Sequence, residues 1–472
     1  MRLREALRPV VMERVALVAP AESARAVLVE VADDGTVELD DPGREEGVAE
    51  LSEAARALQR MGGAAPARPA LTRTPPDVID CERAGRADVL AGEAELDEHV
   101  RHAVAQGRVA AWLAWTPHES VEAISRRIAA HGGALVPLRR LPGSIPPTLL
   151  PETRATREFA PLVQTYATVP YADVNPAVMA GVAYVGMFGL MFADAGHGLL
   201  LVAAALLVRS GRVERLHRLQ PYWRFHAAAG VASTAAGLLY GEFFGPTGVV
   251  PVLWLSPLEE PVTLMLAAVV VGAVLLAGAY GLGAVNRYRE GGWRLTAYAP
   301  SGLAGATLFL GLGAVAGGLS FAPGWLVPVG VAISLLGLGA TAVGLFVSAG
   351  GGGAGVAQAL VESVNLVVRL GSNLVSFARL AAFGLTHAAL GSVVWQGTTA
   401  LWGQGLLASA AAVLVFLIGN ALTFALEGVV AAIQALRLEY FELFSRVFDG
   451  ESRPFRPWHV AVLPEEESCP RG

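Results

Sequence analysis

The 472-residue sequence contains no lysine, only two cysteines and few charged side chains of any kind. All 35 basic residues are therefore arginines, and no polylysine tail exists. Charged residues make up 16% of the chain, against about 25% in an average soluble domain. Because hydrophobic residues reach 54%, this deficit excludes a disordered or nucleic-acid-binding protein and indicates a membrane protein.

The two cysteines, Cys81 and Cys469, lie far apart in the sequence and form no CxxC pair. They therefore predict neither a disulfide framework nor a zinc site. The N-terminal segment MRLREALRPVVMERVALVAP is interrupted by charges and has no small-residue cleavage site, so it is a poor signal peptide. We expect the first domain to stay in the cytosol. No cofactor and no metal are predicted.

Residues 1–165 are rich in arginine and acidic residues and predict a small cytosolic α/β (α+β) domain. Short apolar runs at Ala26–Val31 and Val109–Trp115 predict strands. Charged stretches with helical periodicity lie between them, at Glu50–Arg60, Ala87–Gln106 and Ser120–His131. The prolines of Pro142–Pro151 exclude a helix there and indicate a linker.

After about residue 175 the chain consists mainly of long uncharged runs. They lie near 176–193, 195–208, 225–241, 262–286, 297–319, 325–349, 356–397 and 404–447. Most of them reach the roughly 20 residues that a bilayer-spanning helix needs. The first pair is short, and 176–208 predicts either one long helix or two short ones turned at Asp194-Ala-Gly-His-Gly198.

Arginines are concentrated in alternate loops. Loops 209–221 and 286–296 and the tail after 446 carry them, whereas 246–261, 320–324 and 398–403 contain no basic residue. Because basic loops stay in the cytoplasm, an even number of crossings must separate the cytosolic domain from loop 209–221. We therefore predict an all-α membrane domain of eight helices over 166–456, the last two long and tilted, and a cytosolic tail at 457–472. Both termini are predicted to be cytoplasmic.

The seventh apolar segment carries an arginine at bilayer depth. A helix over 356–397 is about 63 Å long, twice the hydrocarbon thickness, and Arg379 lies near its middle. Burying an arginine there costs at least about 2.5–3.5 kcal/mol on insertion scales. Polar residues recur on or close to its helix face, at Asn365, Ser372, Ser376 and Thr386. The pattern predicts a polar stripe centred on a permanent cation.

The eighth segment has a matching polar stripe. Its members follow one another at spacings of 3, 4, 7 and 3 and are Asn420, Thr423, Glu427, Gln434 and Arg437. Such groups are unfavourable against lipid, so the two stripes face each other, another subunit or a water-filled cavity. The alternatives are hydrogen-bonded helix packing for the neutral residues and a static Arg379–Glu427 pair. His387 is either a proton-path group or a packed histidine.

Four motifs occur in order between residues 171 and 448. They are Tyr171–Pro176 followed by Met191–Gly198, then Tyr240–Phe244, Ser376–Leu390 and Gln434–Phe448. Together they resemble the membrane stator subunit of V-type and A-type rotary ATPases, called subunit a or subunit I. That family has a membrane part of eight helices, and its cytosolic arm is usually about twice the size of 1–165 and contains a coiled coil. No sustained heptad run is present in 1–165 of this chain.

The resemblance implies roles for individual residues. It makes Arg379 the essential arginine of the seventh helix. The other positions implied for ion translocation are Arg437, Glu427 and His387, and those in a family motif are Asp194 and His197. The residues predicted to line the half-channels are Asn365, Ser372, Ser376, Thr386, Asn420, Thr423 and Gln434. Family members usually carry histidines where this chain has Gln434 and Glu439.

The resemblance also implies a function without catalysis by the chain itself. The chain would translocate H⁺ or Na⁺ beside a rotating proteolipid c-ring. Peripheral stalk subunits would be further partners, and the V1/A1 ATPase sector an indirect one. The absence of lysine suggests a GC-rich prokaryote, and hence its plasma membrane. Two alternatives are a stand-alone secondary transporter or channel, which predicts inverted repeats, and a purely structural membrane anchor.

Overall fold

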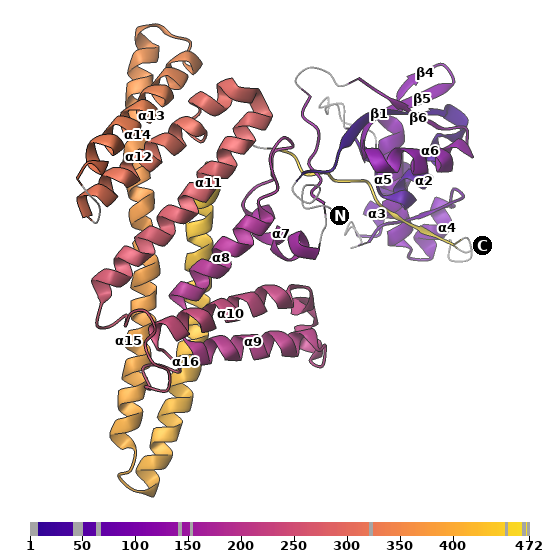
Figure 1. Ribbon diagram of the computed structural model, residues 1–472. Coiled ribbons are helices and arrows are strands. Elements are labelled where there is room, and N and C mark those ends of the chain that lie inside the picture. Colours follow the sequence, from indigo (N-terminus) through magenta and orange to yellow (C-terminus); the bar gives the residue numbers. More distant parts are fainter. Residues whose placement is uncertain are drawn as a thin grey trace. The chain divides into compact units, whose positions relative to one another are not determined.

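The computed structural model divides the chain into two compact units (Figure 1). One comprises Pro9–Leu150 with Ser452–Gly472, and the other comprises Met1–Arg8 with Pro151–Glu451. The residues that the structure describes are 8–40, 51–62, 68–139, 144–151, 154–320, 324–448, 452–464 and 469. A small α/β unit followed by a helical unit confirms the predicted order of fold types.

An antiparallel sheet forms the centre of the N-terminal unit. Its strands run in the order β2 (Glu38–Leu39), β5 (Val109–Pro117), β1 (Met12–Pro20) and β6 (Ala134–Pro137), and β4 (Val104–Gln106) pairs with β5. In the central pair Met12 lies opposite Pro117. Apolar side chains of β1 and β5 pack against α2 (Ala24–Asp34) and α6 (Val121–Ala129) to form one core.

Of the two strands predicted in this unit, one is confirmed and the other is wrong. The strand predicted at Val109–Trp115 is confirmed as β5, whereas the strand predicted at Ala26–Val31 is wrong because this run lies in helix α2. The buried residues of α2 include Ala24, Val27, Leu28 and Val31, the i, i+3, i+4, i+7 spacing of one helix face. A short apolar run by itself does not distinguish a strand from a buried helix.

The helices predicted around the sheet are present, with one difference. α3 (Glu53–Arg60) and α6 lie where helical periodicity predicts them, and α5 covers Ala87–Arg101. The predicted helix continues to Gln106, but residues 104–106 form strand β4 instead. The described part of the proline-rich segment, 144–151, contains no helix.

The C-terminal segment belongs to the N-terminal unit. Strand β7 (Ala461–Leu463) pairs in parallel with β3 (Ala70–Thr72). Cys469 forms a disulfide with Cys81 of α4 (Val78–Arg83), across a separation of 388 residues. The prediction that these cysteines form no disulfide is therefore wrong. Their distance along the chain is no guide, because pairing of β7 with β3 returns the C-terminal segment to this unit.

We expect loss of this disulfide to loosen the C-terminal segment. Replacing Cys469 by serine should lower the free energy of unfolding of the unit by roughly 2–4 kcal/mol and speed amide hydrogen exchange at Ala461–Leu463. Because both cysteines act through one bond, Cys81→Ser and the double variant should shift exchange by the same amount. A reductant should change the native chain in the same way and leave the variants unchanged. Additive effects of the two single variants would contradict the bond.

The second unit is built from helices at the positions of the predicted apolar runs. In chain order they are α7 (Arg154–Tyr166), α8 (Ala177–Met191), α9 (Ala195–Arg209), η3 (Glu214–Tyr222), α10 (Trp223–Tyr240), α11 (Pro261–Tyr298), α12 (Leu303–Ser320), α13 (Leu326–Ser348), α14 (Gly352–Ser376), α15 (Ala378–Leu401), α16 (Leu406–Leu438), η4 (Glu439–Phe444) and α17 (Ser445–Val447). Of the two alternatives for 176–208, the structure has the pair of short helices. The predicted loop 286–296 is instead the end of α11, interrupted at Gly291 and Gly292.

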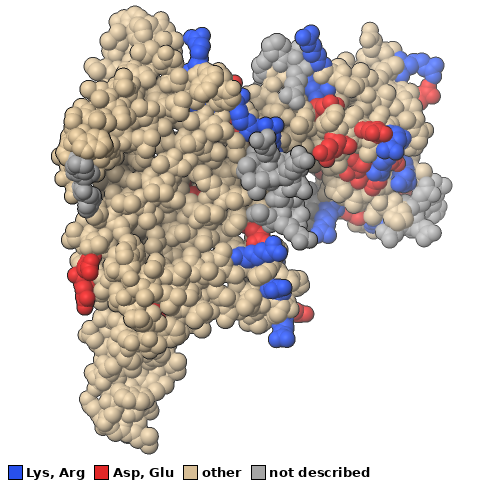
Figure 2. Space-filling model, in the orientation of Figure 1, with Lys and Arg blue, Asp and Glu red and all other residues tan. Residues whose placement is uncertain are grey.

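Five helical segments of the described chain are long and apolar enough to cross a membrane. They are 261–298, 303–320, 326–348, 352–401 and 406–447. α9 and η3–α10 pass the same test together, with a bend of 107° between them, which gives up to six. In Figure 2 the face of the helical unit shows few charged side chains. The helical unit is therefore of the membrane class, whereas the number of eight crossings stays a prediction.

Candidate functional site

Arg379 lies near the middle of a 50-residue helical segment, Gly352–Leu401. α14 and α15 join there through Phe377, which keeps right-handed helical dihedral angles of φ −73° and ψ −15°. The Phe377 ring is fully buried against Gly272 of α11, where a Cβ atom would overlap it. This packing holds the turn that presents Arg379. Figure 1 shows α14 and α15 as parts of one long helical segment.

Arg379 is half-buried and forms no ion pair with any other described residue. The charged groups that act on it electrostatically are Arg437 and Glu442. The structure therefore brings together the two arginines that the sequence analysis singled out on separate helices. The static Arg379–Glu427 pair that was the alternative is not formed.

A π-helical turn places an acidic group beside these arginines. The turn is η4, directly after α16, and single π turns occur frequently at functional sites. Glu442 lies within hydrogen-bonding reach of Ser376 and faces the charges of Arg379, Arg437 and Arg446. The sequence analysis did not assign Glu442 to the site, although its place in the last motif was a signal.

The polar stripe of α14 and α15 faces outwards in the isolated chain. Asn365, Ser372 and Thr386 are exposed, while Ser376 is half-buried like Arg379. The hydroxyl groups of Thr386 and Ser376 donate to carbonyl groups of their own helices, those of Ala382 and Ser372, at 2.8 and 3.1 Å. Arg379 is therefore neither in bulk solvent nor enclosed in the helical unit, and it has an open flank.

The stripe of α16 turns partly inwards. Asn420 and Thr423 are buried, and Gln434 is half-buried. Glu427, whose side chain is 13% exposed, forms an ion-pair contact through Oε2 with Nδ1 of buried His387 on α15. Both α16 and α15 contribute to this contact because they form an antiparallel hairpin (Figure 1). The partner of Glu427 is therefore a histidine rather than an arginine.

Asp194 is a fully buried cap that joins two segments of the chain. Its Oδ1 atom accepts hydrogen bonds from the backbone N–H groups of His197 and Phe244, at 2.8 and 3.0 Å, and Oδ2 accepts from Gly245 at 2.8 Å. The first bond is the N-cap of α9. Gly237 makes room for this arrangement, because a Cβ atom there would overlap the backbone of Asp194 and Ala195.

Asp194 lies in a buried polar cluster with His197, Glu242, His387 and Glu427. The imidazole rings of His197 and His387 have centroids 5.5 Å apart, and Asp194 Oδ1 is 3.8 Å from His197 Nδ1. Glu242 is buried and acts electrostatically on Asp194 and His387. Sequence analysis missed Glu242 as a site residue, although it lies in the motif Tyr240–Phe244.

Aromatic rings enclose this polar cluster. The Phe192 ring lies 5.0 Å from that of His387, and Phe244 and Phe424 lie 5.3 and 5.8 Å from His197. A low-dielectric shell of this kind strengthens every charge interaction inside it. The motif histidine His197 and the ion-translocation candidates His387 and Glu427 therefore form one electrostatic group.

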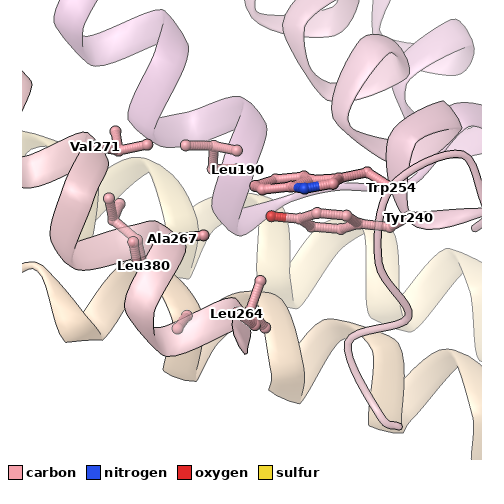
Figure 3. A pocket seen from close by; sticks show the side chains of 9 residues that line it. Leu190, Tyr240, Trp254, Leu264, Ala267, Val271 and Leu380 are labelled. Carbon is pink, nitrogen blue, oxygen red and sulfur yellow. The ribbon is translucent and has the colours of Figure 1, made fainter. Parts of the chain in front are cut away.

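A small apolar cavity lies behind the turn that carries Arg379. Figure 3 shows Leu190, Leu264, Val271 and Leu380 around it, with the Trp254 ring stacked over Tyr240. The lining comes from α8, α10, α11 and α15 and from the loop before α11. Its apolar surface suits helix packing rather than the passage of ions.

The motif Tyr171–Pro176 joins α8 to the end of the helical unit. Asn175 Oδ1 accepts from the Ala177 N–H at 3.0 Å. Asn286 of α11 accepts from Val174 N–H at 3.0 Å and donates to the Val447 carbonyl at 3.1 Å. Burial, with a contribution from Glu290, raises the pKa of Asp173 to about 8. These contacts indicate a structural role for this motif.

Long helices with buried charged groups define a polytopic membrane protein with an α/β domain. The sequence model of the V-type ATPase 116kDa subunit family matches residues 101–247 and 354–460, which is more than half of the chain. The chain therefore belongs to that family.

Individual relatives agree with this assignment. The A-type ATP synthase subunit I of Aeropyrum pernix is 28% identical over 360 residues, covering 64% of this chain and 50% of the relative. That of Halobacterium salinarum is 28% identical over 376 residues, covering 66% and 51%. The vacuolar proton translocating ATPase 100 kDa subunit of Dictyostelium discoideum is 39% identical over 99 residues, covering 20% and 12%. The chain spans about half the length of the archaeal relatives.

Proposed function

We propose that this chain is the membrane stator subunit of a rotary V/A-type ATPase and translocates H⁺ or Na⁺ beside a proteolipid c-ring. The observation that carries the proposal is Arg379, half-buried near the middle of a 50-residue helical segment, without an ion pair to any described residue and with an open polar flank. An unpaired cation at membrane depth is costly and is therefore expected to have a function. A carboxylate on a neighbouring ring subunit supplies the ion-pair partner.

In the proposed mechanism, a protonated ring carboxylate reaches Arg379 through the plane of the membrane. Arginine stays charged, and a nearby fixed cation favours the ionised form of a carboxylate. The ring group therefore releases its proton beside Arg379. The same charge blocks direct passage of cations between the two half-channels, so that ions cross only when the ring turns.

The remaining site residues divide between the two sides of Arg379. Glu427 and Asn420 line one half-channel, where Glu427 accepts protons and His387 contacts it. Arg437 and Glu442 adjust the field at Arg379 from the other end of α16. Residues of the outward stripe, Asn365, Ser372, Ser376 and Thr386, line the surface along which the ring moves, and Thr423 and Gln434 complete the stripe of α16.

The rest of the assembly follows from this role. The eight predicted helices span the membrane with both termini cytoplasmic, and the N-terminal unit contacts peripheral stalk subunits. ATP chemistry belongs to the V1/A1 sector, so the chain is not an enzyme by itself. A prokaryotic plasma membrane is the proposed location.

Cysteine cross-linking within the membranes tests the proposal. Thr386→Cys lies on the exposed stripe of α15, and Leu336→Cys lies on α13 at a site that is 71% exposed. The native cysteines are both in the disulfide, so background reaction is low. We expect Thr386→Cys to cross-link to the proteolipid ring subunit and Leu336→Cys not to do so. Equal cross-linking of both, or purification without any proteolipid, favours a stand-alone transporter instead.

A further inference from the structure

A group of three possible metal ligands lies inside the polar cluster. Asp194, His197 and His387 each offer one ligand atom, and these atoms all lie within 4.8 Å of one another. The three residues are 0%, 1% and 3% exposed. They come from α9, its N-cap and α15, so only the folded helical unit brings them together.

Several polar atoms of this group lack a hydrogen bond among the described residues. They are both ring nitrogens of His197 and Oε2 of Glu242, all buried, whereas Nδ1 of His387 contacts Oε2 of Glu427. A buried polar atom without a partner costs about 1–3 kcal/mol. Several such atoms directed into one small region, enclosed by Phe192, Phe244 and Phe424, indicate that something polar binds between them.

The charges of the cluster favour a cation as that ligand. It contains three carboxyl groups, Asp194, Glu242 and Glu427. The first lies beside the imidazole of His197 and the last contacts that of His387, and no arginine among the described residues forms an ion pair with any of the three. A divalent cation neutralises two carboxylates, which a water molecule does not do. Imidazole nitrogen with carboxylate oxygen is the ligand set of Zn²⁺ and similar transition-metal ions, whereas Mg²⁺ and Ca²⁺ prefer oxygen alone.

We propose that Asp194, His197 and His387 bind a divalent transition-metal ion, with Zn²⁺ as the best match. Zn²⁺ binds nitrogen and oxygen at about 2.0–2.2 Å, so tetrahedral ligand atoms lie about 3.4 Å apart. The 3.8 Å between Asp194 Oδ1 and His197 Nδ1 is close to this spacing. Rotation of the imidazole rings closes the remaining separations.

One of the ligands has a supporting shell. Three backbone N–H groups orient Asp194, and such outer contacts fix a ligand and strengthen its binding.

Zinc titration of the purified full chain tests the site. The protein in lipid nanodiscs is first stripped with a chelator and then titrated with Zn²⁺ alone against a competing zinc-binding chromophore. We expect one high-affinity Zn²⁺ per chain. His197→Gln and His387→Gln should each weaken it by at least about 10-fold, the lower limit found when an outer-shell contact is removed. His217→Gln, an exposed position on η3, is the matched control and should bind like the native chain.

A second measurement covers the case in which a variant fails to fold. X-ray absorption of the zinc-loaded native chain should show nitrogen and oxygen neighbours at about 2.0–2.1 Å with the scattering pattern of two imidazoles. The proposal is overturned if no stoichiometric zinc binds, if folded variants bind like the native chain, or if fewer than two imidazoles surround the metal. None of these outcomes affects the proposed role of Arg379, which is measured by ion transport.

Discussion

Replacing Arg379 by alanine is expected to reduce ATP-driven proton pumping by about three orders of magnitude. A cation about 4 Å from a carboxylate contributes about 4 kcal/mol at the effective dielectric constant of a protein surface, and every 1.4 kcal/mol is about tenfold. Without the guanidinium, the ring carboxylate keeps its proton and the barrier between the half-channels disappears. The measurement is acidification of vesicles that contain the complete reconstituted complex. Arg379→Lys keeps a charge but loses the fork of five donors, so partial loss is expected.

Arg369 offers a matched control for this experiment. It lies on the same helical segment, Gly352–Leu401, ten residues before Arg379. Its side chain is 59% exposed and pairs with Glu362 at 3.3 Å. Arg369→Ala removes an equal charge from α14 but not from the proposed site, and should pump at the native rate. Pumping by Arg379→Ala at the rate of Arg369→Ala would mean that the ring carboxylate does not depend on this cation.

Replacing Asp194 by alanine is expected to destabilise the helical unit by on the order of 5 kcal/mol. The substitution leaves three backbone N–H groups, those of His197, Phe244 and Gly245, buried without an acceptor. Each unsatisfied group costs about 1–3 kcal/mol. The measurement is thermal unfolding in detergent together with the yield of monodisperse protein. Asp194→Asn keeps one acceptor oxygen but turns an N–H₂ group towards one of the donors, so we expect an intermediate loss.

A second N-cap aspartate separates the effect of burial from that of capping. Asp77 caps α4 by accepting from Ile79 and Asp80 N–H groups, at 2.8 and 3.2 Å, but it is exposed. Asp77→Ala should therefore cost only about 1 kcal/mol, because water replaces the lost acceptor. If the two variants lose equal amounts of unfolding free energy, Asp194 acts only as a helix cap, and its bonds to Phe244 and Gly245 add no stability.

The positions of most helices in the helical unit could be predicted, because long apolar runs indicate segments that avoid water and helical spacing indicates which residues share a helix face. Arg379 and the polar stripes of both long helices are recognisable because charged groups are rare in such runs. Short elements are harder to predict. The strand predicted for Ala26–Val31 is wrong because a run of six residues has too few repeats to define a period, although its neighbours complete a helical pattern.

Composition and periodicity are enough to identify a membrane protein with a small α/β domain and to show which of its helices contain charged residues. Which of these residues contact one another depends on the tertiary structure. It paired Glu427 with His387, set Glu442 among three arginines and joined Cys81 to Cys469. The physical reason is that periodicity records burial along a single helix or strand. Contacts between distant segments depend instead on how closely backbones pack, as at Gly237, and on where a chain end returns to pair with a strand.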